Sequence, residues 1–193
     1  MDYRANCLLA IDTSTTHCAA AIFISGTVFT SVKEMKNGQA ELLFEVIEDA
    51  LKKAKIKKTR IDFIVVGIGP GNFTGIRIGL AAAKGLSLSL KVPISGVNSF
   101  QASLYGQKKY KVAVIPARQN LYYLGTMKGN YKTNLAKDGI APQGFAYRPK
   151  GEKFIENMAI LGADLKFSLS KPSPLYIKPA DAQPHTEKVS LIK

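Results

Sequence analysis

The order of predicted elements indicates an α/β protein, with a mixed sheet and flanking helices. Three observations lead to this prediction. Short β-prone runs open the chain, a strongly amphipathic segment follows them, and a continuous apolar run then breaks on glycines and resumes with helical spacing. The 193 residues are 46% hydrophobic and 21% charged, which is ordinary for a globular protein with a packed core.

The three β-prone runs predict an antiparallel meander. They cover residues 7–12, 18–24 and 27–33. Ser25-Gly26 has the length and composition of a tight hairpin turn between the second and third runs. The turn that follows Asp12 is longer and rich in hydroxyl groups, as is common where a strand ends.

Residues 39–54 form the clearest predicted helix, because their apolar side chains recur with the 3.6-residue period. These side chains are Leu42, Leu43, Val46, Ile47, Ala50, Leu51 and Ala54. Asn37-Gly38 stands where a helix cap is expected, and opposite charges four residues apart, such as Asp49 and Lys53, support the other side. The continuous apolar run at 62–68 then predicts a strand that is buried on both faces.

A second helix is predicted for residues 75–90, after a glycine-rich loop. Small side chains recur in it at every fourth position, as Gly75, Gly79, Ala83 and Ser87. Another helix could approach closely along this ridge, either from the same chain or from a second protein, and the sequence leaves both open. A glycine inside a helix costs about 1 kcal/mol relative to alanine, so Gly79 and Gly85 need a packing reason.

The rest of the chain predicts shorter elements. Strands are expected at 92–97, 111–117, 121–128, 130–135 and 159–161, and helices from Asn98 or Ser99 to residue 105 and at 150–157. The proline-rich end predicts extended segments before a short terminal helix. A boundary near 106–109 divides the chain into a lobe of residues 1–106 and a smaller lobe of 107–193, with the terminal segment packing back on the first.

The formal net charge is +13, and six of the nine residues from 52 to 60 are basic. Such a patch attracts phosphates, but it is also typical of a solvated helix end, where cations are favourable. No aromatic residue interleaves with these lysines to stack on bases, which favours the solvated end. The candidate RNA contacts in this patch are Lys52, Lys53, Lys57, Lys58 and Arg60.

The cysteines and histidines predict neither a disulfide nor a metal site. If the first two strands pair as a hairpin, Cys18 faces a residue near Asp12 and not Cys7. His17 and His185 lie far apart, and neither has an evident partner for a catalytic triad. The chain also lacks an apolar run of 18 residues and the layout of a signal peptide, so a cytoplasmic location without membrane contact is expected.

The glycine loop at 69–75 is a candidate for anion or nucleotide binding. It does not match a dinucleotide fingerprint, since Thr74 replaces the third glycine, and no P-loop lysine follows. An anion nest and a tight structural turn both remain open. Asp12 could hold a magnesium-bound phosphate, although a lone carboxylate at a strand end is more often a turn or helix-capping acceptor. The candidate residues are Asp12, Thr13, Ser14, Gly69, Gly71, Asn72 and Thr74.

Three segments resemble the bacterial TsaB (YeaZ) family. They are Leu9-Ala10-Ile11-Asp12-Thr13-Ser14-Thr15, Gly69-Pro70-Gly71-Asn72-Phe73-Thr74-Gly75-Ile76-Arg77-Ile78-Gly79 and Pro174-Leu175-Tyr176-Ile177-Lys178-Pro179. The resemblance implies an actin-like, sugar-kinase-like (ASKHA) fold of two lobes, with the second lobe reduced. It also implies a non-catalytic subunit that requires no cofactor of its own, with ATP or ADP a candidate ligand only at a partner interface.

The resemblance further implies partners and an interface. The partners would be a TsaD-like paralogue, which modifies adenosine 37 of tRNA, and a TsaE-like ATPase, with tRNA reached through the complex and a homodimer formed without the paralogue. The implied interface is the pair of helices at 39–54 and 75–90, with Leu42, Leu43, Val46, Gly75, Arg77, Gly79, Ala83 and Ser87 as its residues. Gln39 and Pro116 depart from the family pattern. The alternative functions are a reduced nucleotide-binding phosphotransferase and a direct tRNA-binding protein.

Overall fold

The computed structural model describes residues 6–117, 121–128, 130–135, 143–164 and 171–177, and its first sheet has five strands in the order β3-β2-β1-β4-β5. The strands are β1 (Cys7–Asp12), β2 (His17–Ile24), β3 (Thr27–Glu34), β4 (Phe63–Gly67) and β5 (Ile94–Val97). β1, β2 and β3 pair antiparallel, whereas β4 runs parallel to both β1 and β5. The predicted meander and mixed sheet are confirmed.

The hairpin between β2 and β3 has the turn that its sequence predicts. Ser25 and Gly26 adopt φ angles of 50° and 80°. Two consecutive positive φ angles define a type I′ turn, whose twist matches that of the flanking strands. The turn sets the register in which Ile24 faces Thr27 and His17 faces Glu34.

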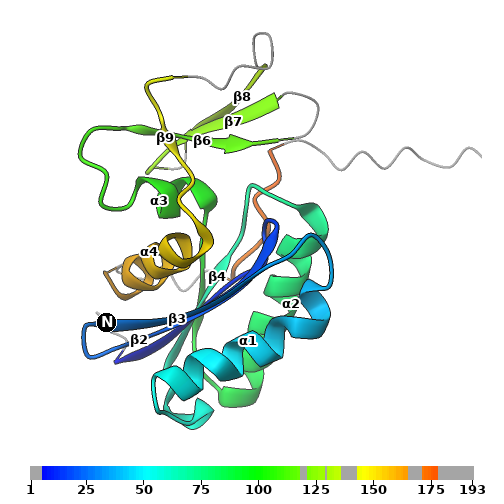
Figure 1. Ribbon diagram of the computed structural model, residues 1–193, viewed down its shortest axis with the longest axis vertical. Helices are drawn as coiled ribbons and strands as arrows, with labels where there is room; N and C mark the ends of the chain where they lie inside the picture. The colour runs from blue at the N-terminus through cyan, green and yellow to red at the C-terminus, as the bar shows by residue number, and fades with distance from the viewer. Residues whose placement is uncertain (1–5, 118–120, 129, 136–142, 165–170, 178–193) are drawn as a thin grey trace, which may run out of the picture.

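Helices cover both faces of this sheet (Figure 1). α1 (Gln39–Lys53) and α2 (Phe73–Leu90) lie on one face, and α4 (Gly151–Asp164) lies on the other. Side chains alternate across a strand, so Leu9 and Ile11 of β1 contact the α1–α2 side while Leu8 and Ala10 contact α4. Both layers are closed by buried apolar side chains, which explains why β4 and residues 7–11 of β1 are apolar.

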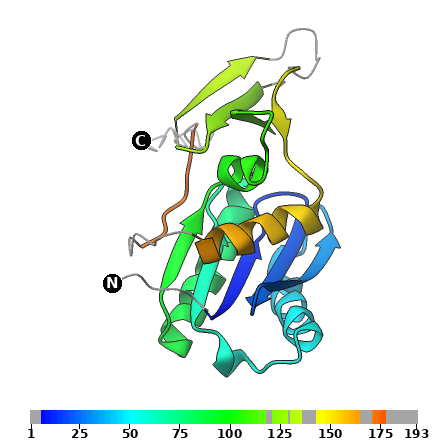
Figure 2. The same cartoon turned by 90° about the vertical axis from the view of Figure 1, so that its left-hand side faces the viewer.

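A second sheet of four strands lies above α3 (Ser99–Leu104), as Figure 2 shows. Its order is β8-β7-β6-β9, formed by β6 (Val112–Pro116), β7 (Leu121–Thr126), β8 (Tyr131–Leu135) and β9 (Ala146–Tyr147). Phe100 of α3 packs against Gly125, where an added Cβ would lie 2.4 Å from the ring. α3 begins at Asn98 with a complete capping box, in agreement with the predicted start. The division into lobes at residue 106 stays a prediction.

The predicted end of the second lobe needs correction. Residues 150–157 and 159–161, expected as a weak helix and a strand, belong to the single helix α4. A short apolar run cannot distinguish a strand from a buried helix segment. In α4, Gly162 lets the helix approach the sheet, because a Cβ there would lie 2.5 Å from Val65 Cγ2.

Several smaller differences complete the comparison. α2 begins at Phe73, two residues before the predicted start, and a 3₁₀ turn η1 (Lys58–Arg60) follows α1. β9 was not predicted, because two residues carry no periodic signal.

Residues 171–177 are extended, as expected, and the Leu175 amide donates to Ile68 O at 2.8 Å. The predicted terminal helix lies outside the described residues. Within the described ranges, none of the helices is both long and apolar enough to cross a bilayer.

Candidate functional site

The glycine loop that launches α2 packs directly on the turn after β1. The Asn72 amide donates to Ser14 O at 2.6 Å, and Thr13 Oγ1 donates to Gly75 O at 2.6 Å. A Cβ at Gly71 would lie 2.2 Å from Ser14 O, and one at Gly75 would lie 1.9 Å from Thr13 O. These glycines therefore allow two segments of the same chain to touch through their backbones.

The N-terminus of α2 is also capped from within the chain. The Asn72 side chain accepts a hydrogen bond from the Gly75 amide at 2.9 Å, so this amide already has a partner. The structure brings together the predicted anion-loop residues 12–14 and 69–74, and several of their polar groups are bonded within the chain, such as Gly69 O, which accepts from the Ser99 amide at 2.8 Å. Thr13 and Ser14 are buried, whereas Asn72 and Thr74 are exposed. Anion or nucleotide binding by this loop stays a prediction.

Asp12 lies in a buried charged cluster. Its Oδ2 atom is 2.6 Å from His17 Nε2 and 3.5 Å from Arg148 Nη2. Arg148 Nη2 also lies 3.3 Å from His17 Nδ1, and the guanidinium stacks on Phe154 at 4.0 Å from the ring centroid. Asp12 therefore contacts two side chains, whereas the sequence suggested a turn or capping acceptor or a magnesium-bound phosphate. The sequence showed no evident partner for His17 in a catalytic triad, and in the structure Thr15 Oγ1 also lies 3.4 Å from His17 Nδ1.

The electrostatics of this cluster favour a charged carboxylate. Burial by itself would raise the pKa of Asp12, but the hydrogen bond from His17 and the charges of His17 and Arg148 outweigh it. The pKa of Asp12 is therefore lower than its ordinary value. A carboxylate can only accept hydrogen bonds, so His17 donates through Nε2. Arg148 is a residue that sequence analysis missed, since it lies 136 residues from Asp12 and belongs to no motif.

The predicted ridge of small residues faces the chain's own sheet. A Cβ at Gly79 would lie 2.6 Å from Thr13 Oγ1 and 3.7 Å from Val66 Cγ2. Ser87 Oγ donates to Val92 O at 2.6 Å. Val46, Gly75, Gly79 and Ala83 are buried within the chain, and their part in a partner interface stays a prediction.

An apolar groove lies on the outer side of the same two helices, and we call it the helix-pair groove. Its volume is about 570 Å³. Its lining residues are Ala40, Leu43 and Phe44 from α1, and Ile78, Ala81, Ala82, Gly85 and Leu86 from α2. Phe44 leaves 53% of its surface exposed, and Leu88 at the end of α2 leaves 82% exposed. An exposed apolar face of this kind is typical of a binding surface.

Gly85 in this groove has no explanation within the chain. A Cβ added there would meet no heavy atom within 4 Å. Glycine inside a helix costs about 1 kcal/mol relative to alanine, so the monomer would be more stable with alanine at this position. The two glycines that needed a packing reason therefore differ. At Gly79 a side chain would collide with Thr13, whereas Gly85 lines the groove and has room for one.

The other predicted contact residues lie on the surface. Leu42 is half-buried on α1. The Arg77 guanidinium stacks 3.8 Å from the Phe73 ring centroid, and its Nε donates to Tyr176 Oη at 3.1 Å. The predicted RNA contacts Lys52, Lys53, Lys57, Lys58 and Arg60 are all exposed. Lys53 is engaged with Asp49 at 2.9 Å and with Thr30 O at 3.1 Å.

The comparison with known proteins places the chain in a family. The family model described as "TsaD: tRNA N6-adenosine threonylcarbamoyltransferase" matches residues 33–172. A Buchnera aphidicola protein named "tRNA threonylcarbamoyladenosine biosynthesis protein TsaB" is 35% identical over 130 residues, which are 66% of this chain and 61% of that protein. The chain belongs to the TsaB (YeaZ) family.

One further relative supports the TsaB (YeaZ) assignment, and a solved structure supports the fold. The TsaB protein of Escherichia coli is 33% identical over 99 residues, which are 51% of this chain and 43% of that protein. A crystal structure from Pseudomonas aeruginosa, described as similar to the peptidase YeaZ, superposes with a TM-score of 0.72 at 22% identity and covers 90% of this chain and 100% of that one. This structure supports the predicted fold. The chain matches only 61% and 43% of the length of the two named TsaB relatives.

Proposed function

We propose that this chain is a non-catalytic partner subunit in the biosynthesis of threonylcarbamoyladenosine at position 37 of tRNA. In this proposal it binds the catalytic TsaD-like paralogue through the helix-pair groove and supports its activity together with a TsaE-like ATPase. The names of its TsaB relatives support the pathway. The observation that carries the binding role is Gly85, a destabilising helix glycine that lines an apolar groove and at which an added Cβ would meet no heavy atom within 4 Å.

The shape of the groove fits a helix from the partner. Gly85, Ala81 and Ala82 have small side chains, so the backbone of a second helix can approach α2 closely. Phe44 and Leu88 stand out at the surface and would become buried in such a contact. Burial of apolar surface stabilises association by roughly 25 cal/mol per Å². A paralogue of the same fold would supply the matching pair of helices, and a second copy of this chain would do so when the paralogue is absent.

The reactive side chains of the described chain support a non-catalytic role. Asp12 and His17 are held in a buried cluster with Arg148. Cys7 and Cys18 are buried, and burial raises the pKa of each thiol to about 11, so neither is a ready nucleophile at neutral pH. In this proposal, tRNA and nucleotide chemistry belong to the partner proteins.

The test is a Gly85→Arg variant, with Thr59→Arg as its matched control. Gly85 is exposed and a Cβ there would meet no heavy atom within 4 Å, so we expect the arginine variant to keep the fold and to block the groove. Thr59 is an exposed position outside the groove and receives the same added charge. We expect Gly85→Arg to lose co-elution with the TsaD-like paralogue in size-exclusion chromatography, and Thr59→Arg to keep it. Co-elution of the Gly85→Arg variant at the unmodified level would refute the interface.

A further inference from the structure

The second lobe contributes a charge pattern that the helix-pair groove does not use. Between residues 63 and 137 the sequence contains ten lysines and arginines and no acidic residue. Six of these ten basic residues fall between positions 108 and 132: Lys108, Lys109, Lys111, Arg118, Lys128 and Lys132. Basic residues without acidic neighbours produce a positive electrostatic potential at the surface where they gather.

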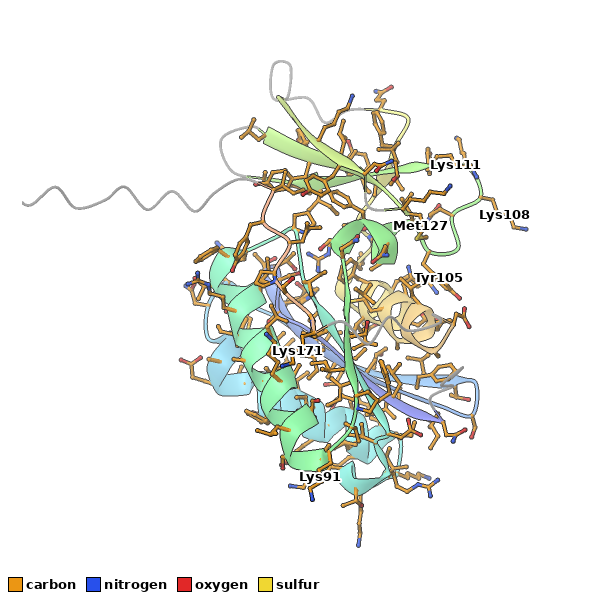
Figure 3. All side chains as sticks on the ribbon, turned by 180° about the vertical axis from the view of Figure 1, so that it is seen from behind. Lys91, Tyr105, Lys108, Lys111, Met127 and Lys171 are labelled. Atoms are coloured by element: carbon orange, nitrogen blue, oxygen red, sulfur yellow. The ribbon has the colours of Figure 1, made fainter. Side chains whose placement is uncertain are left out.

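The register of the second sheet brings four of these lysines to one end. Val112 pairs with Thr126, so the loop before β6 and the turn after β7 meet at the same edge. The Thr126 amide donates to Asn130 O at 2.9 Å and closes that turn. We call Lys108, Lys109, Lys111 and Lys128, with Tyr110 and Met127, the basic end. Figure 3 labels Lys108, Lys111 and Met127, and they lie together at this end of the sheet.

The basic end combines exposed cations with apolar surface. All four lysines are exposed, and Met127 leaves 38% of its surface exposed. Tyr110 packs partly on the core around Phe100, and Lys109 Nζ lies 5.3 Å from its ring centroid. At the border of this surface Asp164 is already engaged, since its Oδ2 accepts a hydrogen bond from Tyr105 Oη at 2.7 Å.

We propose that the basic end binds a single-stranded nucleic acid. Lysines in the order Lys108-Lys109-Tyr110-Lys111 place cations on both sides of an aromatic ring. Proteins that bind single strands combine such cations for the phosphates with aromatic faces on which bases stack. The patch at residues 52–60 differs, because it has no aromatic residue and one of its lysines is paired with Asp49. An acidic protein segment would match the charge but would not use the tyrosine.

The test compares two triple variants of the full chain that remove equal charge. Lys108, Lys109 and Lys111 become alanine in the first, and Lys52, Lys57 and Lys58 become alanine in the matched control. Binding of a labelled oligouridine RNA of about 16 nucleotides is followed by fluorescence anisotropy as salt is varied. The slope of log affinity against log salt should become shallower by about 2 in the first variant, since each single-strand phosphate contact contributes about 0.7. The control should keep the slope of the unmodified chain.

A third variant, Tyr110→Leu, separates base stacking from charge. It keeps apolar packing on the core and removes the aromatic face, so RNA affinity should fall about tenfold. Equal losses in the two triple variants, or no loss in either, would overturn the proposal. Competition by polyglutamate as strong as that by the RNA would also overturn it and would favour an acidic protein partner. The measurement uses this chain alone, so failure of the helix-pair groove would leave its outcome unchanged.

Discussion

At the scale of single residues, the Asp12 carboxylate is the most consequential buried charge. Its side chain is fully buried, and the Arg148 side chain that faces it is 13% exposed. Removal of one member of a buried pair leaves the other charge uncompensated, which typically costs about 3 kcal/mol or more. Asp12→Asn should therefore lower the free energy of unfolding by about 3 kcal/mol in urea denaturation at neutral pH. Asp49→Asn, which breaks an exposed pair with Lys53, should cost at most about 0.5 kcal/mol.

The same cluster predicts a pH dependence. The pKa of Asp12 is lowered in the folded state, so its contribution to stability is present above the ordinary aspartate pKa of about 3.9 and is lost as the pH falls through the lower folded value. The difference in unfolding free energy between the unmodified chain and Asp12→Asn should accordingly shrink below about pH 4. A difference that stays constant down to pH 2 would show that Asp12 does not carry this charge effect.

Two glycines of α2 give opposite expectations for the same substitution. Gly79→Ala should destabilise the chain by about 1 to 3 kcal/mol, because the new Cβ collides with Thr13 Oγ1. Gly85→Ala should stabilise it by about 1 kcal/mol, because alanine is the better helix former and nothing obstructs it. Thermal and urea unfolding of the two variants show whether each substitution raises or lowers the free energy of unfolding. If Gly85→Ala proved destabilising, Gly85 would have a role within the monomer and would lose its weight as a sign of a partner.

At the scale of elements, the segment 171–177 is held on α2 by a stack of three side chains. Arg77 lies over Phe73, and the Phe73 and Tyr176 ring centroids are 4.8 Å apart. Arg77→Ala removes this cation–π contact and the hydrogen bond to Tyr176, so the segment should open more often. Hydrogen exchange should then be faster at the Leu175 amide, which bonds to Ile68, and unchanged in β1. Unaltered exchange at Leu175 would mean that the stack does not hold the segment.

Local patterns explain why most elements could be predicted and why some could not. Ser25-Gly26 and the periodic side chains of α1 specify their structure through neighbouring residues, and the model agrees with both. α4 was divided wrongly because the apolar run at 159–161 is a buried helix segment, whose Ala159 and Leu161 pack in one cluster with Val65, almost a hundred residues earlier. The partnership of Asp12 with Arg148 has the same origin. Long-range packing, which a single sequence does not display, decided each of these cases.

The candidate site could also be predicted only in part from the sequence. The resemblance pointed to the helices α1 and α2 as a partner interface, which stays a prediction, and the sequence singled out both Gly79 and Gly85 as glycines in need of a reason. The sequence left open whether the ridge of small residues packs within the chain or against a second protein. The structure shows Gly79 of that ridge against the turn after β1 and the first sheet, and it leaves the apolar face of Phe44, Ala81 and Gly85 open. Helical periodicity gives the stripes of a helix, but it does not say which stripe faces the chain's own core.

At the scale of the whole molecule, the account assigns different tasks to different surfaces. The first sheet and its helices present the helix-pair groove, and the second sheet presents the basic end. The buried cluster of Asp12, His17 and Arg148 connects the turn after β1 with the residue that follows β9. In this arrangement a partner protein and a nucleic acid could bind at the same time, because the two surfaces share no residue.

The most direct test of the central claim is reconstitution of the tRNA modification with the TsaD-like paralogue, the TsaE-like ATPase and tRNA. Formation of threonylcarbamoyladenosine is measured with this chain omitted, with the unmodified chain, with Gly85→Arg and with Thr59→Arg. The account predicts modification with the unmodified chain and with Thr59→Arg, and loss of modification when the chain is omitted or carries Gly85→Arg. Full modification without the chain, or with Gly85→Arg, would contradict it.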